Sequence, residues 1–387
     1  MKQKYQLEPL TPVHIGTGET LNFMDGCYAD SKWYHIDLDK VLKHPSTDIN
    51  ALTSEMAQRN FRWQRYLQQR NMNPAEFSAY SLPCQQSPEA GDILEAIKTP
   101  DNRPYIPGST LKGALRTVLL SEFIIKDDNL FQNSLTHLQN LINQKTRGNP
   151  RRETPAKKIE QDAFGKDPNH DLLRALQVSD TETLASDTLE IGMAWTVTLN
   201  ENEQLVQKID NRQEYKNFVQ QIQPEQKLTF TLKIDELLFR EQEDRRLRFS
   251  DLQKNILRDV AKVCRSDADV RMKDERSFFD YYHFTEIANL YDELIELNER
   301  LSKDAFMLQI GWGTGYHANT VTAIFTDDDE SPDTLLRDLR NRFRLGESRS
   351  QRGNYDKREF PKTRRILYQG QNPSAPLGWI KISPIED

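Results

Sequence analysis

Apolar and polar side chains alternate along several short segments, which is typical of strands that bury one face of a sheet. Every second residue is apolar from Ile191 to Leu199 and again from Leu228 to Ile234. Shorter alternating segments run from Phe306 to Ile310 and, less regularly, from Trp33 to Leu38. We therefore predict strands in these four segments, and an earlier strand at Gln3–Pro9.

Apolar residues recur at helical spacing in four other segments. The clearest begins after the turn Ile106-Pro107-Gly108, where Ser109 is placed to be the N-cap of a helix that runs to Phe123. Further helices are expected at Leu52–Gln69, Phe278–Leu301 and Leu335–Phe343. Because helices and strands follow one another without βαβ regularity, we predict an α+β protein with antiparallel sheets.

The order of these elements is compatible with a ferredoxin-like (RRM-like) βαββαβ unit in the first part of the chain. Such a unit would contain a strand at Gln3–Pro9, a helix at Ser109–Phe123, and strands at Leu173–Val178, Leu189–Leu199 and Lys227–Asp235. A more degenerate second unit would follow.

The predicted domains are residues 1–240 and residues 241–387, with a helical insertion at about 38–99. We expect a long exposed loop at Gln144–Asp162, where basic and polar residues replace any periodic pattern. The 387 residues are enough for two domains and a large core.

The composition favours a cytoplasmic protein. The mean hydropathy is -0.77, and no apolar run approaches the length that crosses a bilayer. The first residues lack the apolar segment of a signal peptide. The three cysteines lie far apart and match no metal-site spacing, so we expect reduced cysteines, no bound metal and no cofactor.

Charge is distributed unevenly along the chain. The net charge is -7, but residues 337–365 contain 11 Lys/Arg and 4 Asp/Glu, a balance of +7, which leaves -14 for the rest. Residues 145–158 add six basic residues against one acidic residue. A segregated basic surface is what a polyanion-binding protein needs. Solvated basic loops would explain the same pattern equally well.

Two segments place glycines where backbone could approach a ligand. The first, Leu10–Gly18, contains His14, Gly16, Thr17 and Gly18, although a lone GxG is more often an ordinary tight turn. The second, Leu308–His317, has three glycines in five residues. Trp312 lies between the first two glycines, and Tyr316 follows the third. Its amides could bind phosphates and its aromatic rings could stack on bases, or the rings could fold back onto the core. Neither segment is a P-loop or a dinucleotide-binding motif.

Two further segments carry basic side chains. In the helix that starts near Ser109, the free amides of the first turn form an anion site. Lys112 and Arg116 lie four residues apart and share one helical face, around Gly113. Near the C-terminus, Phe360–Arg365 contributes Lys362, Arg364 and Arg365, ahead of an alternating strand at Leu377–Ile382. There we expect a bulge or a close approach at Gly378, and a buried Trp379.

These segments resemble the RAMP superfamily of CRISPR proteins. The matching features are TPVHIGTG after the first strand, YIPGSTLKGALR, Phe164-Gly165 followed by LQVSD at Leu176–Asp180, and the late glycine-rich loop. Within the superfamily, LQIGWGTG together with FPKTRRILYQG and PLGWIKI resembles the branch that forms the fifth subunit of type III-A (Csm) effectors. The late loop departs from many RAMP proteins, because no further glycine follows in Tyr316–Asn319.

The resemblance implies a non-catalytic subunit with tandem RRM-like domains that caps the 3′-end side of a Csm complex and is needed for guide maturation and assembly in antiviral defence. The implied partners are the CRISPR RNA (crRNA), the neighbouring backbone RAMP subunits of the Csm complex, target RNA and host nucleases, with no membrane. The RNA-binding candidates are His14, Gly16, Thr17, Gly18, Ser109, Lys112, Arg116, Gly311, Trp312, Gly313, Thr314, Gly315, Lys362 and Arg364.

A metal-independent guide-processing ribonuclease of the same superfamily is the alternative. Such an enzyme needs a general base, and His14 and His317 lie in or beside glycine loops where a base could act. Neither has a second histidine nearby in sequence, so we favour the non-catalytic role. The corresponding end subunit of the related Cmr complex is a third candidate, and the PLGWIKI segment argues against it.

Overall fold

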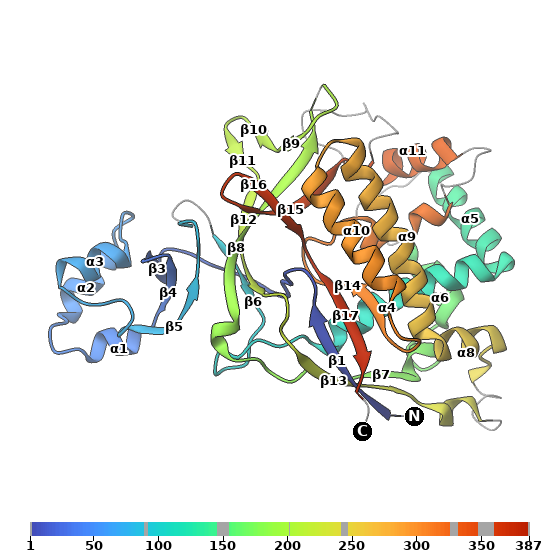
Figure 1. Cartoon of the computed structure of the whole chain (residues 1–387), viewed down its shortest axis with the longest axis horizontal. Coiled ribbons are helices and arrows are strands. Elements are labelled where there is room, and N and C mark those ends of the chain that lie inside the picture. The colour runs from blue at the N-terminus through green and yellow to red at the C-terminus, as the bar shows by residue number, and fades with distance from the viewer. Residues whose placement is uncertain are drawn as a thin grey trace.

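The computed structural model describes residues 2–88, 92–144, 155–200, 202–240, 247–325, 332–346 and 360–385. It is a mixed α+β fold with several sheets, as the alternating and helical patterns predict. A body contains two large sheets and most of the helices, and a small lobe projects from one side of it (Figure 1).

The first large sheet has five strands in the order β14-β17-β1-β13-β7, and all neighbours are antiparallel. Its strands are β1 (Lys2–Pro9), β7 (Leu176–Val178), β13 (Leu228–Ile234), β14 (Phe306–Gln309) and β17 (Trp379–Pro384). Leu7 lies at the centre, opposite Leu228 on one side and Ile382 on the other. The first and last strands of the chain are therefore hydrogen-bonded neighbours.

The second large sheet has seven strands. Six follow the order β16-β15-β8-β12-β6-β2, and β9 pairs with the end of β8. Its strands are β2 (Gly16–Leu21), β6 (Ile93–Ala96), β8 (Leu189–Leu199), β9 (Leu205–Gln207), β12 (Lys216–Ile222), β15 (Thr363–Gln369) and β16 (Asn372–Pro376). Only β12 and β6 are parallel among these described pairs. After β9, the strands β10 (Ile209–Asp210) and β11 (Gln213–Glu214), of two residues each, form a short hairpin.

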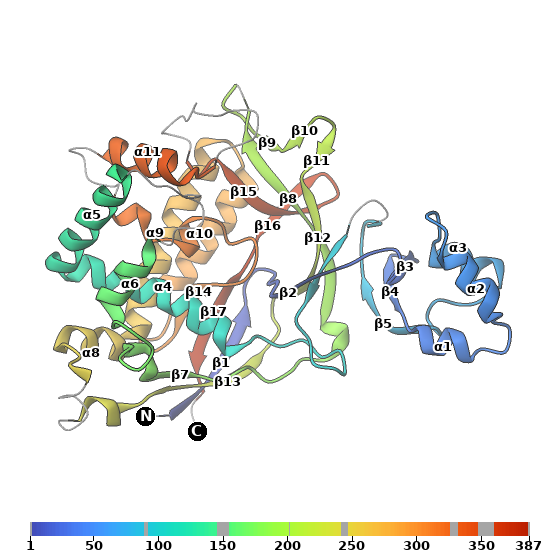
Figure 2. The same ribbon diagram turned by 180° about the vertical axis from the view of Figure 1, so that it is seen from behind.

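Helices cover the five-stranded sheet on the side of the body away from the lobe (Figures 1 and 2). The innermost are α4 (Gly108–Lys126), α9 (Val260–Tyr281) and α10 (Thr285–Glu299). Around them lie α5 (Asp128–Asn143), α6 (Ala156–Phe164), α8 (Asp251–Arg258) and α11 (Pro332–Phe343). Short 3-10 turns are η2 (Leu172–Arg174), η3 (Ser186–Thr188), η4 (Glu236–Phe239), η5 (His317–Asn319) and η6 (Thr322–Phe325). No helix in the described part of the chain is long and apolar enough to span a bilayer.

The lobe consists of a three-stranded sheet and three short helices. These are β3 (Gly26–Ala29), β4 (Lys32–Ile36), β5 (Ser78–Pro83), α1 (Leu38–Lys43), α2 (Ile49–Met56) and α3 (Trp63–Gln69). Its own apolar core is separate from that of the body and contains Trp63, Tyr66 and Leu67. The predicted helical insertion overlaps this lobe, but the lobe begins with strands at Gly26, and β6 returns to the seven-stranded sheet.

Two predicted helices are wrong as single elements. The segment Leu52–Gln69 forms α2 and α3 with a break between them, and Phe278–Leu301 is divided between α9 and α10. The second break lies at His283, which has a φ of 60°. It lets α10 fold back on α9, so that the rings of Phe279 and Tyr291 stack with centroids 5.9 Å apart.

The expected loop at Gln144–Asp162 is also partly wrong, because α6 begins at Ala156 and the remainder lies mostly outside the described residues. The close approach expected at Gly378 is confirmed. Its φ is 91°, and a Cβ there would lie 2.3 Å from the carbonyl oxygen of Ile310. Trp379 is buried, as predicted, with 1% of its surface exposed.

Candidate nucleic-acid interface

The two glycine loops, which are almost 300 residues apart in sequence, lie against each other. The backbone N–H of Trp312 donates a hydrogen bond of 2.9 Å to the carbonyl oxygen of His14. Gly311 has a φ of 84°, and a Cβ on it would lie 2.4 Å from the same carbonyl oxygen. Only glycine allows this approach, so the late loop is docked directly on the early one.

The late loop and the C-terminal basic segment together line one hollow of about 370 Å³, which we call the loop hollow. Its lining residues are Thr196, Gly311, Trp312, Gly313, Thr314, Gly315, Tyr316, Asn319, Pro361, Thr363, Arg364 and Arg365. The guanidinium of Arg365 lies 4.6 Å from the centre of the Trp312 ring. Two segments selected separately from the sequence therefore form a single surface.

Hydrogen bonds within the late loop hold its shape. The side-chain amide of Asn319 donates to the Gly315 carbonyl at 2.7 Å and to Thr314 Oγ1 at 3.1 Å. Thr314 Oγ1 in turn donates to the Gly311 carbonyl at 3.2 Å. A loop that is already ordered loses little entropy on binding, and an aromatic ring beside a cation suits a stacked base and its phosphate.

Not every polar or aromatic group in the loop hollow is available to a ligand. Tyr316 folds back, with its hydroxyl donating to Thr322 Oγ1 at 2.9 Å and its ring packed on Phe360. Arg364 is paired with Glu275 through oxygen contacts of 2.7 and 2.9 Å and lies over the ring of Phe278. The exposed cation that faces Trp312 is its neighbour Arg365, which the sequence did not distinguish from the rest of the basic run. Lys362, just before β15, contacts no acidic side chain among the described residues.

The early loop presents backbone at the edge of the seven-stranded sheet. Gly16, Thr17 and Gly18 are exposed at the start of β2, where the pairing with β6 is irregular. Gly18 has a φ of 92°, with open space around it. These residues are placed to approach a ligand, and Thr17 Oγ1 adds a hydroxyl, which accepts from the Glu19 amide at 3.1 Å.

His14 lies beneath the two loops and is only 2% exposed. Its Nδ1 is 2.6 Å from the Gln220 carbonyl oxygen, and its ring meets Trp312 edge-on at 6.0 Å between centroids. Burial lowers the pKa of His14, although the contact with Gln220 opposes this shift. We conclude that His14 supports the Trp312 ring from below, and that RNA would not reach it directly.

Acid should destabilise the protein through this histidine. Because its pKa in the folded state lies below the unfolded value of about 6.5, the unfolded chain binds the proton more readily. Stability is therefore full above about pH 6.5 and falls as the pH decreases below that value. Burial also lowers the pKa of His35 and His317, which act in the same direction. Urea unfolding at pH 7.5 and 5.5 measures the difference, and His14→Gln should reduce it. In the exposed control His283→Asn, the difference in stability between the two pH values should remain. An equal reduction in this variant would contradict the assignment of the acid sensitivity to His14.

The helix segment selected from the sequence occupies a different place. Ser109 is not the N-cap, because α4 begins at Gly108 after Pro107 and has no side-chain cap. The Gly108 N–H already donates to Asp180 Oδ1 at 2.7 Å, so a carboxylate of the protein occupies the expected anion site. The sequence did not reveal this, since Asp180 lies far along the chain in the LQVSD segment.

Lys112 and Arg116 likewise have partners within the protein. Lys112 Nζ donates to the Leu173 carbonyl at 2.7 Å. Arg116 contacts Glu160 Oε2 and Asp171 Oδ2, both at 2.9 Å, and lies over the ring of Phe164. These contacts join α4 to α6 and η2, so both residues stabilise the body, and their predicted contact with RNA stays a prediction.

A family model describing the RAMP superfamily matches residues 6–317 of this chain. The chain belongs to the RAMP superfamily. The match covers the early glycine loop, the α4 segment and the late glycine loop. The family resemblance expected from these motifs is therefore confirmed.

Two curated RAMP relatives are similar in sequence, and both are described as "CRISPR system Cms protein Csm5". The protein from Methanocaldococcus jannaschii is 22% identical over 412 aligned positions, which cover 98% of this chain and 88% of the relative. The protein from Streptococcus thermophilus is 33% identical over 134 positions, which cover 30% of this chain and 38% of the relative.

Solved structures share the fold over the whole chain. One chain of the cryo-EM structure of a Csm-crRNA-target RNA ternary complex in a type III-A CRISPR-Cas system matches with a TM-score of 0.72 at 22% identity, covering 99% of this chain and 100% of that one. The crystal structure of T. onnurineus Csm5 matches with a TM-score of 0.67 at 19% identity, covering 97% of this chain and 99% of that one.

Proposed function

We propose that this RAMP protein is a non-catalytic subunit of a type III-A CRISPR effector that binds the 3′-proximal part of the crRNA and caps that end of the complex. Its role would be to complete assembly and help set the length of the mature guide. Its partners would be the crRNA, the adjacent backbone RAMP subunits, target RNA and the nucleases that trim the guide.

The observation that carries this proposal is the convergence of the two glycine loops with the basic strand β15. Docking of Gly311 on His14 brings open backbone, the Trp312 ring and the Arg365 guanidinium to one surface. Such a surface offers no group that would recognise the edge of a particular base. We therefore expect it to bind the RNA backbone and to stack on bases, with an affinity that depends strongly on salt. The full-length fold match to a chain of a Csm-crRNA-target RNA complex supports the same role.

We also propose that the fold contains tandem ferredoxin-like units. The strand order β7-β13-β1-β17, all antiparallel, is the order of a βαββαβ unit, with α4 following β1. The predicted membership was wrong for Leu189–Leu199, because this strand is β8 of the seven-stranded sheet and β17 takes its place in the unit. The units predicted at 1–240 and 241–387 would then share sheets, because β17 adds to the first sheet and β15 to the second. Such sharing would hold the C-terminal part of the chain firmly against the N-terminal part.

The geometry of His14 argues against the ribonuclease alternative. A general base must come within hydrogen-bond reach of the attacking hydroxyl. Its Nδ1 lies 2.6 Å from the Gln220 carbonyl oxygen, and the residue is only 2% exposed, so the ring is out of reach of an attacking hydroxyl. A buried ring of this kind is suited to hold the loops together.

Trp312→Ala and Arg365→Glu should each lower the affinity of the protein for guide RNA. Loss of one stacking ring reduces affinity about tenfold, and charge reversal adds repulsion of phosphate. The measurement is co-expression of the tagged chain with the other effector subunits and a CRISPR array, followed by sequencing of the bound RNA. We expect guides of mature length with the natural chain, and loss of this subunit or longer guides with either variant.

Lys262→Glu is the matched control, because it reverses an exposed charge on the outer surface of α9. It should leave guide length and subunit content unchanged. Cleavage of repeat RNA by the isolated chain, abolished by His14→Ala, would overturn the proposal in favour of a nuclease. Failure of the natural chain to join the complex would overturn it as well.

A further inference from the structure

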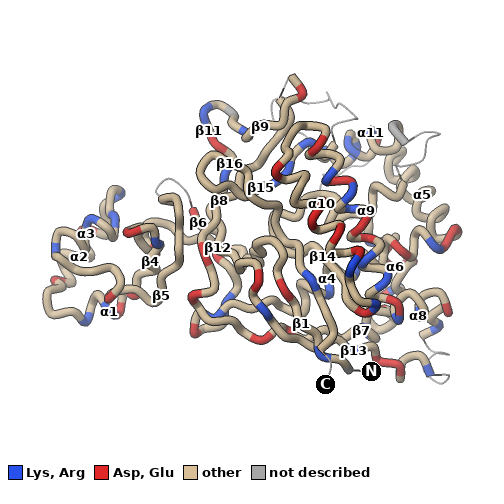
Figure 3. Tube along the Cα trace, viewed as in Figure 1, with Lys and Arg blue, Asp and Glu red and all other residues tan. Residues whose placement is uncertain are grey.

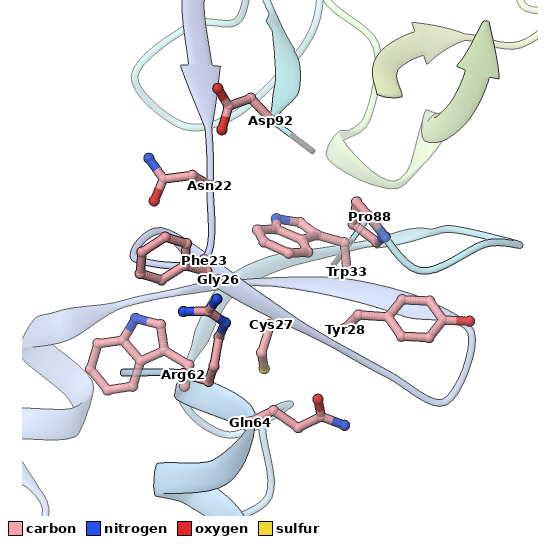
Figure 4. A pocket seen from close by; sticks show the side chains of 11 residues that line it. Asn22, Phe23, Gly26, Cys27, Tyr28, Trp33, Arg62, Gln64, Pro88 and Asp92 are labelled. Carbon is pink, nitrogen blue, oxygen red and sulfur yellow. The ribbon is translucent and has the colours of Figure 1, made fainter. Parts of the chain in front are cut away.

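A second hollow, which we call the lobe pocket, lies at the junction of the lobe with the body. It shares no lining residue with the loop hollow. It has a volume of about 670 Å³, within the range of sites that hold small organic ligands. Its walls come from the turn after β2, from β3 and β4, and from the beginning of α3 (Figure 4). Its lining residues include Asn22, Phe23, Tyr28, Trp33, Arg62 and Asp92.

Flat side chains dominate these walls. Phe23 is 38% exposed, unusual for a phenylalanine, and the Arg62 guanidinium lies 4.0 Å from the centre of its ring. Tyr28 and Trp33 stand on the other side of the opening in Figure 4. An aromatic face with an arginine across it suits a planar ring that stacks between or upon them.

One wall also has an unused hydrogen-bond donor. Trp33 is only 5% exposed, yet its indole Nε1 has no hydrogen-bond partner among the described residues. Buried indoles normally find one, as Trp63 does by donating to the Met24 carbonyl at 2.7 Å. Figure 4 shows the Trp33 nitrogen on the side of the ring that faces Asn22 and Asp92. A ligand with polar atoms at its edge would meet the donor, the amide and the carboxylate there.

Arg62 lines this pocket, and two more arginines lie within three residues of it along the chain. Arg59, Arg62 and Arg65 are exposed, and none of them forms an ion pair with another described residue. Figure 3 shows several basic positions in the lobe, around α2 and α3. Arg70, at the far end of the same helix, differs because it is paired with Glu55 at 2.6 Å. The basic rim therefore has charge left for an external anion next to the aromatic pocket.

We propose that the lobe pocket holds one unstacked base of a bound single-stranded RNA. The base stacks on Phe23 and Trp33, its polar edge faces Asn22 and Asp92, and the flanking phosphates lie on Arg59, Arg62 and Arg65. A peptide would also fit an aromatic pocket, but the three arginines favour a polyanion. The proposal rests on the proposed RNA-binding function, and it adds a second contact outside the loop hollow.

The test uses the full chain and a set of unstructured RNA 15-mers that carry one abasic position each. Phe23→Ala should weaken binding of the intact RNA about tenfold, as expected for loss of one stacked base. One abasic position should weaken binding to the natural chain to a similar degree. With that RNA, Phe23→Ala should cause little further loss, because base and ring contribute through the same contact.

Tyr281→Ala is the matched control, since Tyr281 is an exposed aromatic residue at the end of α9, outside the lobe. It should leave affinity unchanged. If the chain binds RNA equally well with Phe23→Ala, and every abasic RNA loses the same affinity in both proteins, the lobe pocket is not a base site although the RNA-binding function stands. If the natural chain binds none of these RNAs, the proposed function fails first. Weaker assembly with a protein subunit, without any change in RNA affinity, would show that the pocket takes a peptide.

Discussion

Gly311→Ala is expected to push the two glycine loops apart and to lower the free energy of unfolding by about 3 kcal/mol. The added Cβ would lie 2.4 Å from the His14 carbonyl oxygen, a backbone atom that cannot rotate away. The φ of 84° adds the steric penalty of the left-handed region. Urea unfolding monitored by circular dichroism measures the loss. Guide RNA binding should fall as well, because Trp312 follows Gly311 directly.

Gly315→Ala provides the control within the same loop. Its φ is 86°, but a Cβ there meets nothing within 4 Å, so only the conformational penalty of about 1 kcal/mol remains. The difference between the two variants therefore isolates the contact with His14. Equal losses in stability would show that the loops are not docked as described.

Glu275→Ala is expected to destabilise the protein by about 3 kcal/mol, because it leaves the Arg364 guanidinium buried without a counter-charge. The two side chains are 11% and 14% exposed, and Nε of Arg364 contacts both oxygens of Glu275. This pair attaches β15, and so one wall of the loop hollow, to α9. Chemical unfolding at neutral pH gives the magnitude.

The exposed pair Arg300–Glu296 is the matched comparison, since its side chains are 76% and 63% exposed. Arg300→Ala should change stability by less than about 0.5 kcal/mol. The double variant Arg364→Met with Glu275→Leu should recover most of the stability lost in Glu275→Ala, because no charge then remains buried. Failure of the double variant to recover any stability would show that shape, rather than charge pairing, holds this contact.

Strand alternation allowed much of the sheet structure to be predicted. The predicted strands at 191–199 and 228–234 are confirmed, because the apolar face of each meets a core, and the one at 306–310 is confirmed as far as Gln309. The breaks inside two predicted helices were not visible, since the sequence around His283 has neither glycine nor proline. The break is imposed by packing of α10 on α9, a tertiary contact that a local pattern does not contain.

The candidate site shows the same limit. Glycines and aromatic residues marked both loops, but no sequence pattern indicates that Gly311 lies on His14. Alternation along β15 does imply that Arg364 and Arg365 point to opposite faces. It does not say which face meets Glu275 and which meets Trp312, so Arg364 was selected and Arg365 was not. In α4, the basic pair looked free because its partners Glu160, Asp171 and the Leu173 carbonyl come much later in the chain.

The position of β1 in the five-stranded sheet has a consequence for synthesis on the ribosome. β1 is synthesised well before both of its neighbours in the sheet, β13 and β17, with Tyr5 opposite Phe230 on one side and Pro384 on the other. The nascent chain must therefore keep β1, with its core residues Tyr5 and Leu7, unpaired on one side until β17 has been made. Premature termination anywhere before Trp379 would leave that strand open on one side and attract chaperones or proteases. Only a chain translated through β17 can close its central sheet.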